Sequence, residues 1–195
     1  MNKITIFLFY LSMLFTNYTL ADNEGNRYVA AIKNNADQGD AYAQFLLGGI
    51  YDNAMGVKQD YLEASTWYRK AALQGHAASQ FRLGLFYATG LAGFQDYMQA
   101  RKWYEKAASQ GNAEGQHYLA MMYSGGNTVR QDHKKAKSLY EQSARQGYAP
   151  ALHYLGAVYE FGHGVRQDHI VAKEWYGKAC DKGYQDGCDA YRRLN

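Results

Sequence analysis

Three kinds of residue in this chain could carry chemistry: two cysteines, six histidines and a regularly spaced set of aspartates. The spacing of Cys180 and Cys188 is not the Cys-x-x-Cys of a redox or metal pair, although it allows a disulfide. Four carboxylates would suit a metal ion only if other ligands lay beside them. We find no such neighbours, and interpret the aspartates as helix N-caps instead. They are Asp60, Asp96, Asp132 and Asp168.

The histidines are scattered, although two pairs share a register. His133 and His169 each follow one of the aspartates, where we expect a solvent-facing side chain. His117 and His153 lie 36 residues apart in equivalent positions, so they could approach one another. A metal there would need ligands that we cannot identify. We therefore expect surface histidines, no metal site and no cofactor.

Motifs for catalysis are missing from the sequence. It contains no Gly-x-Ser-x-Gly, no phosphate-binding glycine-rich loop with Lys-Ser/Thr and no His-Glu-x-x-His. Hydrophobic residues make up 47% of the 195 positions and charged residues 20%, which is a globular balance. The net charge is +3 and the charges form no basic run. A nucleic-acid partner, which needs a clustered basic face, is not expected.

The element that positions these residues is a repeat of 36 residues. Its clearest segment is Trp67-Tyr68-Arg69-Lys70-Ala71-Ala72, closed by Gly75, and the later copies begin at Trp103, Leu139 and Trp175. A fixed period of this size indicates stacked repeats. The segment is therefore scaffold, and variation between copies is the better guide to function.

Each unit is expected to form two helices. In the first unit Leu47, Gly48 and Tyr51 share one face of a helix over 41–53. Glycine recurs at the register of Gly48, which suggests that two helix backbones cross closely there. A loop then leads to the capping aspartate, and Asp60 with Glu63 forms a capping box. Asp96 with Gln99 is expected to form a second capping box.

The first 21 residues have the pattern of a secretory signal peptide. Lys3 is followed by an apolar segment from Ile4 to Phe15, which is too short to span a bilayer comfortably. We expect cleavage after Ala21 and a periplasmic or secreted protein without stable membrane insertion. In an oxidising compartment Cys180, which ends one helix, and Cys188, which begins the next, are expected to form a disulfide.

The pattern Leu-Gly-x-x-Tyr, Gly-x-Gly-Val, Asp, and Trp-Tyr-x-Lys-Ala-Ala resembles the Sel1-like repeat, a relative of the tetratricopeptide repeat. The resemblance implies an all-α, right-handed α/α superhelical solenoid of helix-turn-helix repeats. The cysteine spacing is similar to that of the cysteine-rich exported branch, which supports the disulfide. The expected organisation is a signal peptide (1–21), an N-terminal capping helix (22–40), repeats 41–76, 77–112, 113–148 and 149–184, and a C-terminal capping helix (185–195).

In superhelical repeats of this type the first helix of each unit lines the concave face. Positions outside its Leu-Gly-Tyr stripe hold aromatic residues with few charges, which suits a peptide or helix of a partner protein. Alternatively, Phe45, Phe81 and Tyr154 simply pack between neighbouring helices. The predicted protein-binding residues are Tyr42, Phe45, Asp52, Asn53, Phe81, Arg82, Leu85, His117, Tyr118, Met121, His153, Tyr154, Glu160 and Phe161.

Two principal function hypotheses follow. The first is an exported, non-catalytic adaptor that binds another protein along this face, in host interaction, envelope assembly or toxin immunity. The second, implied by the resemblance alone, is a weak β-lactamase or penicillin-binding protein, although no serine is followed by lysine three residues later. A self-associating structural module is a third possibility.

Overall fold

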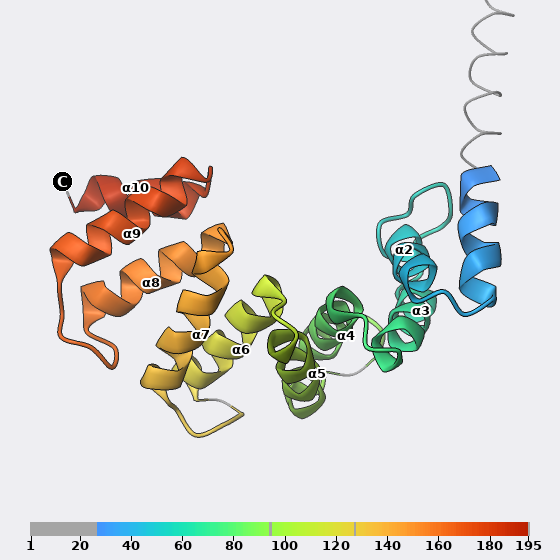
Figure 1. Cartoon of the computed structure of the whole chain (residues 1–195), viewed down its shortest axis with the longest axis horizontal. Coiled ribbons are helices and arrows are strands. Elements are labelled where there is room, and N and C mark those ends of the chain that lie inside the picture. Colours follow the sequence, from blue (N-terminus) through green and yellow to red (C-terminus); the bar gives the residue numbers. More distant parts are fainter. Residues whose placement is uncertain (1–26, 94, 127, 195) are drawn as a thin grey trace, which may run out of the picture. The chain divides into compact units, whose positions relative to one another are not determined.

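The computed structural model describes residues 27–93, 95–126 and 128–194, and every regular element in these ranges is a helix. The expected leader, residues 1–21, lies outside them. Residues 27–37 form a first helix, which is followed by nine labelled helices (Figure 1). These are α2 (Ala41–Asp52), α3 (Tyr61–Leu73), α4 (Ala77–Thr89), α5 (Tyr97–Ser109), α6 (Ala113–Gly125), α7 (His133–Arg145), α8 (Ala149–Phe161), α9 (His169–Asp181) and α10 (Gln185–Arg193). The all-α helical repeat fold is confirmed.

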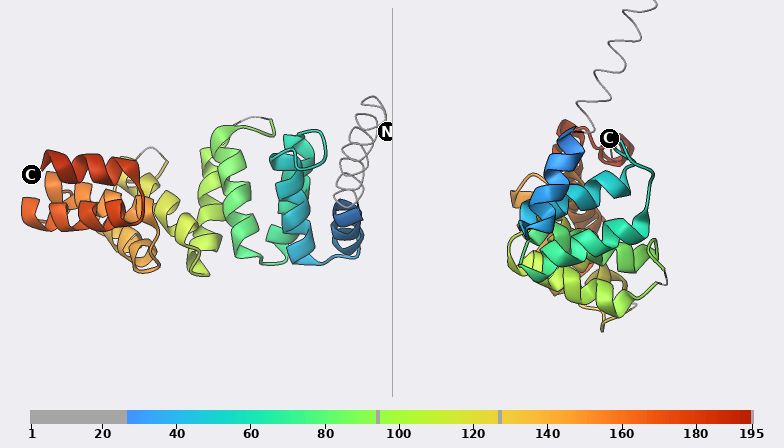
Figure 2. Two further views of the ribbon diagram at one scale, coloured as in Figure 1. Left: turned by 90° about the horizontal axis from the view of Figure 1, so that it is seen from above. Right: turned by 90° about the vertical axis from the view of Figure 1, so that its right-hand side faces the viewer.

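The chain divides into two compact units between Gln74 and Gly75. In the first unit the helix over 27–37 packs with α2 and α3 around Ile32, Leu47 and Trp67. In the second unit α4 pairs with α5, α6 with α7 and α8 with α9, and α10 lies against α9. Figure 2 shows these hairpins, coloured green to red, following one another along the unit.

The capping aspartates are confirmed as N-caps. The carboxylates of Asp60, Asp96, Asp132 and Asp168 all accept a hydrogen bond from a backbone amide in the first turn of the following helix. The capping boxes are not formed as expected. The Asp60 amide donates to the carbonyl of Tyr51 at 3.1 Å, and the Asp96 amide to that of Tyr87 at 2.8 Å. Because each of these amides already has an acceptor on the preceding helix, the side chains of Glu63 and Gln99 are not needed to accept its hydrogen bond.

The glutamine before each capping aspartate binds the C-terminal end of the preceding helix. The sequence analysis missed this contact. The side-chain amide of the glutamine donates to a carbonyl in the last turn of the preceding helix, at 2.5–2.8 Å. These carbonyls would otherwise lack an intrahelical partner. The four glutamines are Gln59, Gln95, Gln131 and Gln167.

The helix glycines make room for tyrosine rings. A Cβ atom on Gly48 would lie 2.6 Å from Cδ1 of Tyr68, and one on Gly84 would lie 2.7 Å from Cδ1 of Tyr104. The atoms closest to these glycines therefore belong mainly to a tyrosine ring of the paired helix. The expectation that the glycines let two helix backbones cross closely is corrected accordingly. The rings fill the space between the two helices of each hairpin, and Tyr68 and Tyr104 are each only 1% exposed.

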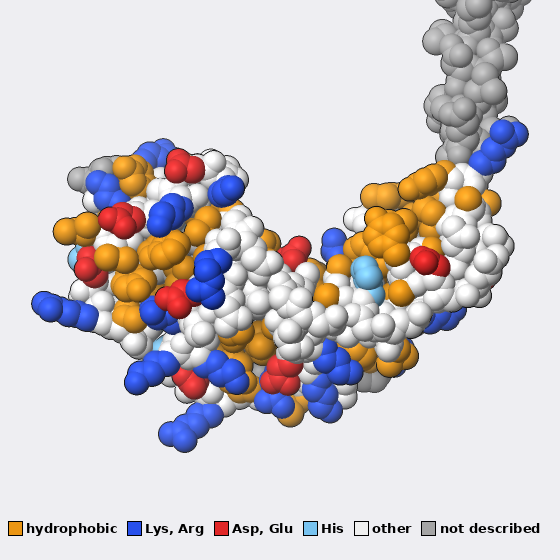
Figure 3. All heavy atoms as spheres, in the orientation of Figure 1, with side chains coloured by type: hydrophobic (Ala, Val, Ile, Leu, Met, Phe, Trp, Pro, Cys, Tyr) orange, Lys and Arg blue, Asp and Glu red, His pale blue; other side chains and the backbone are white. Residues whose placement is uncertain are grey.

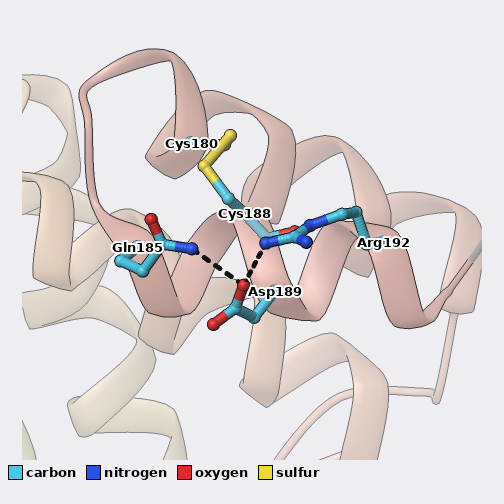
Figure 4. Close-up of a disulfide and its surroundings, with 5 residues drawn as sticks. All are labelled: Cys180, Gln185, Cys188, Asp189 and Arg192. Carbon is cyan, nitrogen blue, oxygen red and sulfur yellow. Dashed lines mark hydrogen bonds and ion pairs between the residues drawn. A yellow bond between two sulfur atoms is a disulfide. The ribbon is translucent and has the colours of Figure 1, made fainter.

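The C-terminal helix is held by a disulfide and by a buried carboxylate. Cys180 of α9 and Cys188 of α10 are bonded, as expected (Figure 4). Beside them the Gln185 amide donates to Asp189 at 2.9 Å. On the other side of α10, Arg193 reaches back to Glu160 of α8, with Nη2 to Oε2 at 2.8 Å.

Candidate functional site

The expected binding positions of α4, α6 and α8 meet in a continuous array of aromatic rings. The ring of Phe81 lies 5.3 Å from that of Tyr118, measured between centroids. His117 lies 5.1 Å from Tyr154, and Tyr154 lies 5.6 Å from His153. These distances are typical of tilted and edge-to-face aromatic contacts. The structure therefore brings five of the predicted residues together within the second unit.

Only part of this array is open to solvent. Tyr118, His153 and Tyr154 are half-buried, whereas Phe81 and His117 are 8% and 3% exposed. The expectation of a surface His117 is wrong, and Phe81 is a packing residue, as the alternative interpretation held. The apolar face of each first helix is broader than the Leu-Gly-Tyr stripe, so the neighbouring position is also covered.

Glu160 is likewise buried, at 4% exposed, and does not face a partner. Its carboxylate accepts from the Tyr176 hydroxyl at 2.6 Å and from Arg193. Hydrogen bonds from Arg193 and Tyr176 lower the pKa of this carboxyl, although burial opposes the shift. Two donors brought by α9 and α10 thus allow a charge to be buried.

The remaining predicted residues are distributed over both units. In the first unit Tyr42 is 61% exposed and Phe45 packs 6.0 Å from Tyr68. Asp52 accepts from the Tyr68 hydroxyl, and Asn53 donates to the Gly49 carbonyl within its own helix. In the second unit Met121 and Phe161 are exposed, whereas Arg82 and Leu85 are half-buried.

Two residues that the sequence analysis missed extend the array. Tyr148 and Tyr184 occupy the N-cap positions of α8 and α10 but make no side-chain cap hydrogen bond. Asn112 caps α6 at the equivalent position through its side chain. The Tyr148 ring lies 5.3 Å from His117, and the Tyr184 ring lies 5.4 Å from His153. Loss of a polar N-cap in these two copies was the available signal.

We call Tyr118, Tyr148, Tyr154 and Tyr184 the aromatic surface. All four rings are partly exposed and pack on a buried layer that includes His117 and Tyr140. Burial raises the pKa of Tyr148 to about 12, so its hydroxyl remains a neutral donor at physiological pH. Burial, with His153 nearby, lowers the pKa of His117 to about 4. Tyr148 therefore offers a neutral hydroxyl group on a rigid ring.

One serine–histidine contact resembles the hydrogen-bonded pair formed by a catalytic serine and its general base. The Ser79 hydroxyl lies 2.9 Å from Nδ1 of His76, and the same nitrogen accepts from the Ser79 amide at 3.3 Å. Ser79 is 0% exposed, so no substrate can reach it. The contact caps α4 and does not form a catalytic dyad.

Two further findings concern the described part of the chain. It contains no group of three or more His, Cys, Asp or Glu side chains placed to hold a metal ion. None of its helices combines the length and the apolar character that crossing a membrane requires.

Paired helices with caps, glycines and tyrosines in constant register define a helical-hairpin repeat protein. The chain belongs to the Sel1 repeat family, whose model matches residues 41–76, 77–112, 113–148 and 149–184. Repeats of this family generally mediate protein–protein interaction. A search of curated proteins found no match.

Several solved structures are similar. The chain is 36% identical to c5321, a protective antigen of uropathogenic Escherichia coli strains, with a TM-score of 0.77 over 82% of this chain and 34% of that one. It is 34% identical to a Sel1 repeat protein from Oxalobacter formigenes, with a TM-score of 0.73 over 77% of this chain and 60% of that one. Helicobacter pylori cysteine rich protein B shares the fold at 23% identity and a TM-score of 0.53, over 68% of this chain and 96% of that one. The chain thus spans about a third of the first protein and 60% of the second.

Proposed function

We propose that this chain is an exported adaptor that binds a partner polypeptide through the aromatic surface of its second unit. The observation that carries the proposal is the set of four partly exposed tyrosines on a buried aromatic layer. Tyrosine is enriched at binding hot spots because a rigid ring supplies large contact area at a low cost in conformational entropy. A surface already ordered before binding also lowers the cost of association.

The ligand that suits this surface is an extended or helical segment with apolar anchors and hydrogen-bond acceptors. Neutral tyrosine hydroxyl groups donate hydrogen bonds, and the rings cover apolar side chains. Burial raises the pKa of Tyr148 and Tyr184, and the negative charges of Glu114 near Tyr148 and of Asp186 near Tyr184 raise it further. A basic residue beside the apolar anchors would therefore fit the rim.

The disulfide supports the export part of the proposal. Disulfides persist in extracytoplasmic compartments and are rare in a reducing cytosol. The Cys180–Cys188 bond joins the last two helices, and the described residues contain no free cysteine. Mass spectrometry of the mature protein tests this directly, because an N-terminus at Met1 would contradict cleavage after Ala21.

Peptide selection against the purified protein, followed by titration of the selected peptides, tests the binding surface. We expect Tyr154→Ala to weaken binding by at least tenfold, as truncation at a hot spot does. Tyr97→Ala, which removes a 48% exposed ring from α5, is the matched control and should bind like the wild type. Equal affinities for wild type and Tyr154→Ala, with equal melting temperatures, would place the site elsewhere.

A further inference from the structure

A basic pocket lies between α5, α6 and the start of α7, and it shares no residue with the aromatic surface. It has a volume of about 670 Å³, within the range of about 300–1,000 Å³ that small-molecule sites occupy. Lys and Arg side chains are frequent along the lower edge of the molecule below α5 to α7, with Asp and Glu side chains among them (Figure 3). The lining residues are Arg101, Tyr123, Val129, Arg130, Gln131, Asp132, His133, Lys134 and Lys135.

The positive charges of this pocket are largely uncompensated. Among the described residues, Arg130, Lys134 and Lys135 form no ion pair with a carboxylate. The Lys135 ammonium donates instead to the Tyr123 hydroxyl at 2.7 Å. Asp132, the one acid in the lining, already accepts the Lys135 amide as the N-cap of α7.

Two buried nitrogen atoms in the pocket residues also lack hydrogen-bond partners. Nε of Arg101 makes no hydrogen bond, and its closest carboxylate oxygen, on Glu105, is 3.8 Å away. Nδ1 of His133, whose ring stacks on His163 with 5.0 Å between centroids, has no partner either. A buried donor without an acceptor costs free energy, which an oxyanion bound beside Arg101 would recover.

The basic residues are a departure from the repeat. At the position of Lys134 the other copies carry Leu62, Met98 and Ile170, and at that of Lys135 they carry Glu63, Gln99 and Val171. The scaffold therefore does not require the two lysines, and the third copy alone places both at the N-terminus of its second helix.

We propose that this pocket binds a phosphate group, either of a small soluble phosphate ester or of a lipid headgroup. A tetrahedral dianion can accept from several donors at once, and Arg and Lys are the side chains typical of phosphate recognition. None of the nine lining residues belongs to the aromatic surface, so this site and the proposed adaptor function can fail independently.

Titration of inorganic phosphate and pyrophosphate, followed by amide chemical shifts at constant ionic strength against chloride, tests the proposal. We expect shifts centred on Lys134 and Lys135 and tighter binding of pyrophosphate. Lys134→Ile/Lys135→Val, which installs the residues of the fourth copy and should fold, is expected to lower affinity at least tenfold. Arg145→Ser/Lys182→Gln removes two positive charges elsewhere, again with residues from other copies, and should stay within twofold.

Vesicles distinguish the two sources of phosphate. Binding to phosphatidylglycerol vesicles but not to phosphatidylcholine vesicles, lost in Lys134→Ile/Lys135→Val, would assign the ligand to a lipid headgroup. Phosphate binding without vesicle binding would assign it to a soluble ester. The proposal is overturned if neither phosphate nor pyrophosphate shifts these amides, or if the Arg145→Ser/Lys182→Gln control loses as much affinity as the pocket variant.

Discussion

His117 should make the stability of the second unit depend on pH, and His117→Phe should reduce that dependence. The ring is 3% exposed, and burial, with His153 nearby, lowers its pKa from 6.5 to about 4. The folded state therefore takes up this proton only near pH 4, whereas the unfolded chain takes it up near pH 6.5. Stability is fully present above pH 6.5 and is lost as the pH falls toward 4. Linkage gives a loss of about 2 kcal/mol at pH 5.

Phenylalanine is the appropriate replacement because the repeat already uses it there. Phe81 occupies the equivalent position on α4 and is 8% exposed. Nδ1 of His117 has no hydrogen-bond partner, so the substitution removes a buried polar atom without leaving another unpaired. We expect His117→Phe to be more stable than the wild type at pH 5 by about 2 kcal/mol beyond any gain at pH 8.

Urea unfolding followed by circular dichroism at several pH values between 4 and 8 measures this difference. His169→Tyr, which changes an exposed histidine to the residue of the first two copies, should leave the wild-type profile unchanged. The His117→Phe variant retains His153, whose pKa is also lowered mainly by burial, so the variant will keep a smaller pH dependence of the same sign. Parallel stability profiles for wild type and His117→Phe between pH 4 and 7 would refute the reasoning.

Two further predictions concern stability. Tyr176→Phe removes a hydroxyl that donates to the buried Glu160 carboxylate at 2.6 Å, and should lower the free energy of unfolding by about 1.5–3 kcal/mol. Tyr104→Phe removes an equivalent buried hydroxyl that has no partner and should be neutral or stabilising in the same urea titration, so an equal loss would contradict the assignment. Cys180→Ser/Cys188→Ser should cost about 2 kcal/mol, and thermal melts should show that dithiothreitol lowers the wild type to the same level but leaves the variant unchanged.

The parts of the fold that sequence reasoning reached are those fixed by local chemistry. The N-cap hydrogen bond of Asp132 joins it to the amide of Lys135, only three residues later. The turn at Gly111, with φ +84°, needs only that one residue to be glycine. Because the repeat recurs every 36 residues, an assignment made in one copy could be applied to the equivalent residues of the other copies. The disulfide was also within reach, since Cys180 and Cys188 lie on either side of one turn.

What sequence reasoning missed depends on pairing between residues far apart in the chain. Glu160 looked like a surface carboxylate because Arg193, its partner, lies 33 residues away on a helix that closes back over α8. His117 looked exposed because the rings that cover it come from Tyr118, Tyr140, Tyr148 and Tyr154. Burial of this kind is set by neighbouring helices, and the period of a single helix does not reveal it.

Positions where the residue of one repeat lowers stability are more informative about function than positions where the repeats merely differ. Tyr148 and Tyr184 replace a polar N-cap worth about 1 kcal/mol, and His117 replaces a phenylalanine with a ring whose Nδ1 is buried and unpaired. Local rules are usually broken only at functional or strained sites. These three departures all lie on the aromatic surface or directly beneath it, and none lies in the first unit. Lys134 and Lys135 also depart from the repeat, because the other copies carry Leu62, Met98 and Ile170 or Glu63, Gln99 and Val171 at these positions. Together these departures favour the second unit as the part of the molecule that binds.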